Sequence, residues 1–141
     1  MMRESINPHS VADTLQYGFS QAVVVSGGHR VYLSGQVGID AHEVLAGPDI
    51  ATQTRTALDN IDTILRGVGG CLADVVMLRL NVAECARYEQ ESVIGVLRER
   101  FPASPPATSW TVVRGLAEPE WLIELVAEAV IREVLPGEET A

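Results

Sequence analysis

The sequence contains no lysine, and its ten arginines stand against nineteen acidic residues, which leaves a net charge of −9. Nucleic-acid grooves and anionic membrane surfaces are bound by clustered basic side chains, and no basic stripe occurs in this chain. We therefore expect no nucleic acid and no membrane among its partners. The simplest interpretation of the acidity is a charged surface that promotes solubility.

Metal-binding patterns are also missing. The two cysteines and three histidines (Cys71, Cys85, His9, His29 and His42) form no CxxC pair and no other spacing typical of metal ligands. Neither a GxSxG turn around a nucleophilic serine nor a GxxxxGK[ST] phosphate loop is present. We expect no metal and no cofactor, and two thiols in a chain of this length suit a reducing compartment.

Long apolar runs are absent, and aromatic residues make up only 5% of the 141 positions. No segment approaches the roughly 20 apolar residues of a membrane-spanning helix, and the N-terminus lacks the apolar core of a signal peptide. We expect a cytoplasmic protein with one domain over residues 1–141. Its core, built mainly from aliphatic side chains, should cover about residues 17–134, with flexible N- and C-terminal ends.

Apolar periodicity predicts seven elements. Alternating patterns indicate strands and a 3.6-residue period indicates helices. The predicted strands are 21–25, 30–37, 75–82, 108–113 and 121–134, and the predicted helices are 50–68 and 87–100. Gly27-Gly28 predicts a hairpin between the first two strands, Asp49 is expected to cap the first helix, and Gly69-Gly70 to end it. The order β-β-α-β-α-β-β predicts an α+β fold with one mixed sheet and both helices on one face.

The two faces of the predicted sheet differ in composition. In the last strand Ile123, Leu125 and Ala127 share an apolar face that suits packing under helices, while Glu124 and Glu128 lie on the opposite face. The second face mixes charged and amide groups with apolar side chains, namely Tyr32, Met77, Val126 and Val130. A partner subunit could cover this semi-apolar surface, or it could be a solvated antiparallel face. For the strand 108–113 the pattern does not decide which side faces the helices.

Several short segments together resemble the RidA/YjgF family, also called the endoribonuclease L-PSP family. They occur in the family's order over roughly residues 17–132 and are Phe19–Ala22, Val31–Gly38, Gln53 with Ala57–Ile61, Asp74–Val76, Pro105–Ser109 and Leu122–Glu124. The resemblance implies a YjgF/chorismate-mutase-like fold and a homotrimeric barrel with the helices outside. It also implies three clefts between subunits that bind small molecules.

Active members of the family hydrolyse reactive imines. The resemblance implies that an arginine grips the substrate carboxylate and that a glutamate on the last strand positions water. Thr108 stands at the arginine position, followed by Ser109 and by Trp110, where the deaminases usually have a small residue. Phe19 stands where many deaminases have tyrosine. This pattern predicts a member that lacks the deaminase arginine, with Trp110 filling part of the cleft, offering a flat wall for stacking, or simply packing in the interface.

Glu124 matches the catalytic glutamate of the family, and a carboxylate among apolar neighbours is costly unless it is paired or hydrated. Arg79 lies on the same face by alternation and could pair with Glu124 or replace the missing carboxylate grip. Ser34, Gly35 and Gln36 are expected to border the cleft. Gly35 serves either close approach of a ligand to the backbone or a β-bulge.

Three functions remain open on this evidence. The first is a trimer that binds a small metabolite in its clefts, with any hydrolysis using Glu124 on an altered substrate. The second is a 2-imino or enamine acid deaminase in which Arg79 or backbone amides hold the substrate. The third is a non-catalytic scaffold or regulatory binding protein, and the absence of the deaminase arginine is the observation that supports it.

Overall fold

Four strands form a mixed sheet in the computed structural model, which describes residues 1–136. Their spatial order is β3 (His29–Tyr32), β6 (Ile123–Ile131), β4 (Val75–Ala83) and β5 (Ala107–Val113). β4 and β5 run parallel, whereas β6 is antiparallel to both β3 and β4. β5 and β3 are therefore the edge strands, and the two longest strands lie in the centre.

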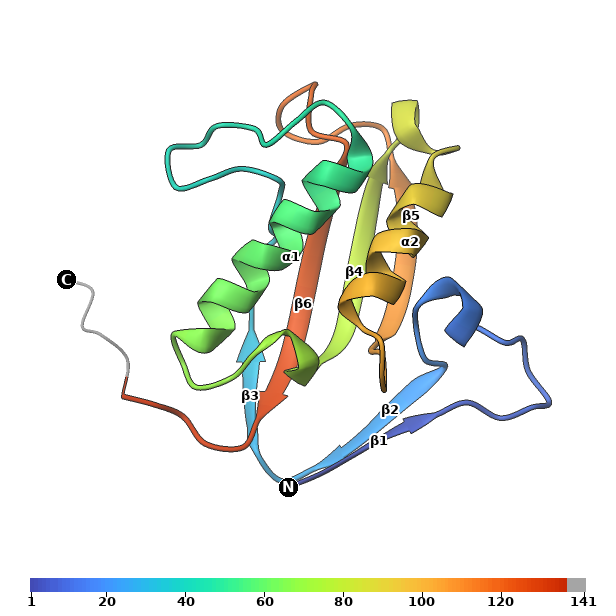
Figure 1. Cartoon of the computed structure of the whole chain (residues 1–141), viewed down its shortest axis with the longest axis vertical. Coiled ribbons are helices and arrows are strands. Elements are labelled where there is room, and N and C mark those ends of the chain that lie inside the picture. Colours follow the sequence, from blue (N-terminus) through green and yellow to red (C-terminus); the bar gives the residue numbers. More distant parts are fainter. Residues whose placement is uncertain (137–141) are drawn as a thin grey trace.

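Two helices pack side by side on one face of this sheet (Figure 1). α1 spans Ile50–Arg66 and α2 spans Gln90–Arg100. The expected apolar residues of the central strands lie under them: Leu78 and Leu80 of β4 and Leu125 of β6 are fully buried. The predicted helices, the mixed sheet and the single helix-covered face are thus confirmed, although α1 ends two residues and α2 begins three residues inside the predicted bounds.

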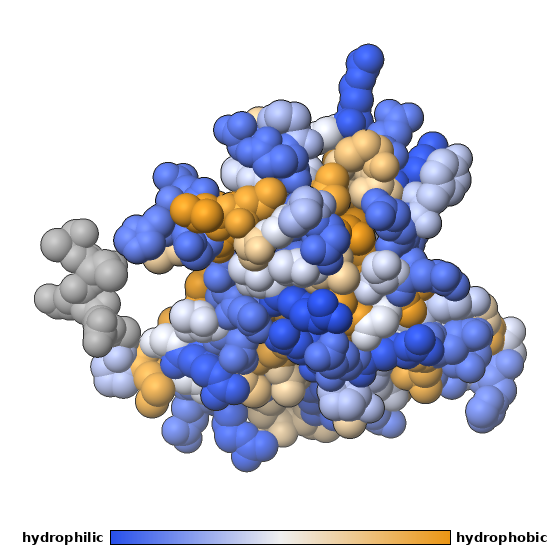
Figure 2. Space-filling model, turned by 45° about the horizontal axis from the view of Figure 1, so that its top comes forward, coloured by the Kyte–Doolittle hydropathy of each residue, from blue (hydrophilic) through white to orange (hydrophobic). Residues whose placement is uncertain are grey.

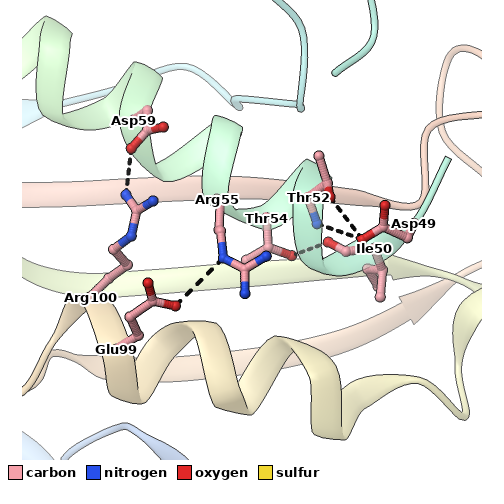
Figure 3. Close-up of polar contacts among 8 residues, drawn as sticks. All are labelled: Asp49, Ile50, Thr52, Thr54, Arg55, Asp59, Glu99 and Arg100. Carbon is pink, nitrogen blue, oxygen red and sulfur yellow. Dashed lines mark hydrogen bonds and ion pairs between the residues drawn. The ribbon is translucent and has the colours of Figure 1, made fainter. Parts of the chain in front are cut away.

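Polar contacts tie the helices to each other and hold the start of α1 (Figure 3). The Asp49 carboxylate accepts a hydrogen bond of 2.9 Å from the backbone N–H of Thr52, which confirms the predicted cap. Arg55 of α1 lies 3.5 Å from Glu99 of α2, and Arg100 pairs with Asp59. These ion pairs are partly exposed, so the apolar layer beneath them supplies most of the stability.

The N-terminal segment differs from the expectation. Met2–Ile6 forms a strand, β1, which pairs with β2 (Ala22–Ser26) in a separate two-stranded sheet. Gly27 and Gly28 do make a turn, with φ of 73° and 77°, but it connects β2 to a strand in the other sheet. The predicted hairpin pairing and the single sheet are therefore wrong, because β2 pairs with β1 and not with the strand that follows the turn.

The β1–β2 ribbon crosses one end of the main sheet, as Figure 1 shows. Arg3 anchors it there: the guanidinium donates to the carbonyls of Val75 and Ser104, each at 3.0 Å. The backbone N–H of Ser20 donates to Pro106 at 2.9 Å and joins the end of the ribbon to the start of β5. These bonds fix the ribbon without continuing the four-stranded ladder.

The remaining differences concern element ends. β3 stops at Tyr32 rather than residue 37, and β6 spans Ile123–Ile131 rather than 121–134. Short 3-10 turns lie at Leu15–Tyr17, Leu72–Asp74 and Glu84–Ala86. The C-terminal end that was expected to be flexible lies, from residue 137 on, outside the described residues. In the tilted view of Figure 2, hydrophilic side chains cover most of the visible surface, with apolar groups scattered among them.

Candidate ligand-binding site

Glu124 lies near the start of β6, on the face of the sheet opposite the helices. Its neighbours Ile123 and Leu125 point into the core and are fully buried, whereas Glu124 is half-buried. The register places it beside Asn81 of β4, whose amide donates to the carboxylate at 3.3 Å. The strand thus holds one carboxylate oxygen against a neutral donor and leaves the other oxygen free for different partners.

Gly35 approaches this carboxylate closely. A Cβ built on Gly35 would lie 2.6 Å from the Cδ and Oε2 atoms of Glu124, a separation that real Cβ atoms essentially never show. Any side chain at position 35 would therefore displace the Glu124 carboxylate. The group that lies against Gly35 in the structure is the Glu124 side chain, and the approach of a ligand to this backbone stays a prediction.

A bulge in the strand creates this approach. The backbone N–H of Leu33 bonds to Ala127, and Gln36 then exchanges both backbone hydrogen bonds with Leu125 at 2.8 Å. Ser34 and Gly35 therefore oppose the single residue between these two partners, which is the geometry of a β-bulge. The β-bulge that the sequence offered as one explanation of Gly35 is therefore present, and it explains why β3 ends early. The Gln36 amide bonds to the Ser34 carbonyl at 3.2 Å and spans the bulge.

Gln53 of α1 orders the chain that leads into Glu124. Its amide is fully buried and donates to the carbonyls of Gly47 and Glu120, each at 3.0 Å, while its oxygen accepts the backbone N–H of Leu122 at 2.8 Å. One side chain thereby fixes the loop before α1 and the segment before β6. The sequence signal for this role was a glutamine on the otherwise apolar face of a helix.

Arg79 does not interact with Glu124. Its guanidinium pairs with Glu128 of β6 at 3.0 Å, in a partly exposed ion pair on the same face of the sheet. No ion pair of Glu124 occurs among residues 1–136, so the structural salt bridge that was considered for it is replaced by the amide of Asn81. Sequence reasoning missed Asn81 as a site residue because only the register between β4 and β6 brings the two together.

Two candidate residues on β5 face the helices. The register pairs Thr108 with Leu78 and Trp110 with Leu80, and residues paired in a ladder share a face. Both are half-buried; Trp110 packs against the core and its indole N–H donates to the Thr108 hydroxyl at 3.2 Å. The question of which side of this strand faces the helices is thereby answered. Ser109 between them is exposed on the face that carries Arg79.

Phe19 belongs with these β5 residues. It is half-buried and precedes Ser20, which bridges to Ala107 at the beginning of β5. Ala107 pairs with Met77, four residues before Asn81 on β4, so this end of the sheet is roughly 13 Å from the Glu124 level.

All predicted site residues except Arg79 and Ser109 fall into two sets within one chain, and the structure adds Asn81 to the first set. The carboxylate set contains Ser34, Gly35, Gln36, Asn81 and Glu124, and the edge set contains Phe19, Thr108 and Trp110. The sheet itself separates Trp110 from Glu124, because Trp110 pairs with Leu80, next to Asn81, on the opposite face; Thr108 and Phe19 lie further along the strands.

Comparison with known proteins identifies the family. The family model described as Endoribonuclease L-PSP matches residues 12–131, so the chain belongs to this family, to which the Rid/YjgF proteins also belong. A Rid-family protein of unknown function from Yersinia pestis has 34% sequence identity and a TM-score of 0.85, with 93% of this chain and 100% of that chain covered.

Other relatives agree with this assignment. A YjgF-family structure from Mycobacterium tuberculosis has 32% identity and a TM-score of 0.63, over 92% of this chain and 100% of that one. A RutC family protein from Sulfurisphaera tokodaii is 37% identical over 91 residues, which are 63% of this chain and 69% of the relative. The resemblance deduced from short motifs is thus confirmed over most of the chain.

The structure also bears on metals and membranes. Within residues 1–136, no three His, Cys, Asp or Glu side chains come together in a way that could hold a metal ion. In the same part of the chain, neither helix has the length and apolar character that crossing a bilayer requires.

Proposed function

We propose that this protein is a homotrimer that binds a small metabolite in clefts between its subunits, with Glu124 as the polar group that handles the ligand. The division of the site residues into two sets is the observation that carries the proposal. Glu124 and Gly35 lie on the open face of the sheet, whereas Thr108 and Trp110 lie at its free edge on the other side. A site that uses both sets needs the edge strand of one copy beside the open face of another.

The open face itself supports assembly. Tyr32 is 69% exposed in the single chain, and Met77 and Val126 on the same face are half-buried. At the edge, Val112 of β5 is 40% exposed. Closed rings of identical subunits are a common way to cover exposed apolar side chains such as these.

The chemistry at Glu124 suits a polar ligand. The carboxylate keeps one oxygen on Asn81 and lies directly against the backbone at Gly35, so it can accept a hydrogen bond from a ligand or hold a water molecule. The hydroxyl of Thr108 carries no charge and cannot make the two parallel bonds that an arginine makes to a carboxylate. The proposal is therefore a ligand, or a hydrolysed substrate, outside the usual 2-imino acids.

A thermal-shift screen of metabolites on the wild type, Glu124→Gln and the exposed control Glu118→Gln tests this proposal. We expect a ligand that stabilises the wild type and the control and that loses its effect in Glu124→Gln. Sedimentation equilibrium should give three times the mass of the chain. A monomer at micromolar concentration, or ligands that ignore the substitution at Glu124, would contradict the proposal.

A 2-imino acid deaminase is the second candidate, and the presence of a half-buried, hydrogen-bonded Glu124 at the family's glutamate position favours it. In that reaction water adds to the imine carbon and ammonia leaves, so 2-iminobutanoate becomes 2-oxobutanoate. The assay generates this imine, or 2-aminoacrylate, in situ and follows release of the keto acid. A rate equal to that of buffer excludes the activity, and a rate gained in Thr108→Arg identifies position 108 as the missing grip.

A non-catalytic scaffold is the outcome that remains if no ligand and no turnover are found. Purification from the native source would then show a stoichiometric protein partner.

A further inference from the structure

A second polar cluster lies on the open face, separate from Glu124. The register places Tyr32 of β3 opposite Glu128 of β6, and Arg30 opposite Val130. Glu128 is four residues from Glu124 along β6, which is roughly 13 Å of extended chain. The cluster of Arg30, Tyr32 and Glu128 thus lies apart from Glu124, and neither the proposed cleft nor the edge set uses it.

The cluster surrounds a small hollow. A concavity of about 230 Å³ is lined by Arg30, Tyr32, Val76, Glu128, Ala129 and Val130. Arg30 also borders a wider hollow of about 680 Å³ beside the Gly27–Gly28 turn. The lining of the smaller hollow therefore combines apolar groups with a guanidinium, a phenol hydroxyl and the carboxylate of Glu128, whose charge Arg79 offsets.

The charges in this hollow do not balance within the chain. The carboxylate of Glu128 already forms an ion pair with Arg79, whose guanidinium nitrogen lies 3.0 Å from Oε1. Among residues 1–136, Arg30 takes part in none of the ion pairs or side-chain hydrogen bonds, although acidic residues outnumber basic ones by nineteen to ten over the whole chain. Arg30 is the cation that this hollow leaves without a partner.

We propose that Arg30 and Tyr32 form a second binding site, for a small carboxylic acid with an apolar body. The guanidinium presents paired N–H donors that match a carboxylate, the hydroxyl of Tyr32 can donate a further bond, and Val76 and Val130 contact the apolar part. The hollow is smaller than a typical drug-sized pocket, so the acid that fits it must be a small molecule with few non-hydrogen atoms.

This inference rests on the proposed trimer in one respect. When neighbouring subunits cover the open face, Arg30 loses water, and an unpaired guanidinium in that setting is strongly unfavourable. A bound carboxylate removes this penalty. The acid is therefore expected to stabilise the assembled protein, and the assembled protein is expected to bind it more tightly than separated subunits do.

Calorimetric titration of the full chain with benzoate tests the inference, with benzamide as a neutral probe of the same shape and inorganic phosphate as an anion without an apolar part. We expect benzoate to bind at least about tenfold more tightly than either control. Arg30→Met should abolish this preference, and Arg30→Lys should retain part of it, because lysine keeps the charge and loses the paired donors. The exposed Arg114→Met is the matched control and should bind benzoate as the wild type does.

A second readout does not depend on the ligand. Arg30 is exposed in the single chain, so in buffer without carboxylates Arg30→Met should raise the thermal midpoint of the trimer only if assembly covers this charge without giving it a partner. Sedimentation of every variant separates the two proposals. A monomer overturns the proposed function and this inference together. A trimer in which Arg30→Met binds benzoate unchanged, or in which only Glu124→Gln loses it, overturns this inference alone.

Discussion

Replacing Gln53 by methionine tests whether one buried amide holds the approach to Glu124. Methionine has nearly the volume and flexibility of glutamine, so the substitution removes the hydrogen bonds without opening a cavity. Gln53 is fully buried and bonds to Gly47, Glu120 and Leu122 at 2.8 to 3.0 Å. The change therefore leaves two carbonyls and one N–H without their partner.

The magnitude follows from the exposure of those three groups. A net hydrogen bond contributes about 1 kcal/mol, and a polar group left buried without a partner costs about 1–3 kcal/mol. Glu120 is exposed, so water can replace the amide there, whereas Gly47 and Leu122 are half-buried and are only partly hydrated. We expect the free energy of unfolding to fall by about 3 kcal/mol, which for a chain of 141 residues lowers the melting temperature by about 10 °C.

Urea unfolding followed by circular dichroism, at one fixed protein concentration, measures the change. Gln90→Met is the matched control, because Gln90 lies at the start of α2 and its amide makes one local bond to the Arg87 carbonyl. The control should change the free energy by no more than about 0.5 kcal/mol. Equal losses in both variants, or a loss below about 1 kcal/mol in Gln53→Met, would refute the assigned role.

Three further predictions concern the site, the assembly and the response to acid. Gly35→Ala should displace the Glu124 carboxylate and weaken ligand binding or turnover while leaving stability nearly unchanged, since the colliding group is the end of a flexible side chain; unchanged binding would contradict this. Tyr32→Glu should dissociate the trimer in sedimentation, and Tyr88→Glu, which alters a side chain that is 91% exposed, should not. A backbone hydrogen bond at the start of α1 holds the pKa of Asp49 below its ordinary value. Asp49 therefore stabilises the fold above pH ~3.9, and this contribution disappears as the pH falls further. As the pH falls below ~3.9, the free energy of unfolding should decrease less for Asp49→Asn than for the wild type. Identical acid-unfolding profiles of the two proteins would contradict the stabilising role of the Asp49 carboxylate.

Much of the fold could be predicted because it depends on local pattern. The apolar spacing of Leu58, Ile61 and Leu65 indicates a helix with one buried face, and all three are fully buried in α1. The alternation of Ile123 and Leu125 with Glu124 likewise placed the carboxylate on the uncovered face. In each case the side-chain period of the element decides the outcome, and that period is visible in the sequence.

Pairing between distant segments could not be predicted in the same way. Met2–Ile6 carries no clear alternation, and β2 pairs with it because the two segments meet in space. The ion-pair partner of Arg79 could not be predicted either, because Arg79 lies opposite Val126, with Glu124 and Glu128 each two residues away along β6, and its guanidinium pairs with Glu128. Alternation assigns faces but contains no information about register across strands that are 40 or more residues apart.

By itself the sequence determined the two helices, the five strands from β2 on, the helix-covered face, the family and most of the residues from which a site could be built. The tertiary structure alone decided how those residues are grouped: Glu124 with Asn81 and Gly35, Arg79 with Glu128, and Thr108 with Trp110 on the other side of the sheet. The physical reason is that element type and face follow from neighbours along the chain, whereas grouping follows from register and from a one-residue bulge, which emerge only when distant strands pack together.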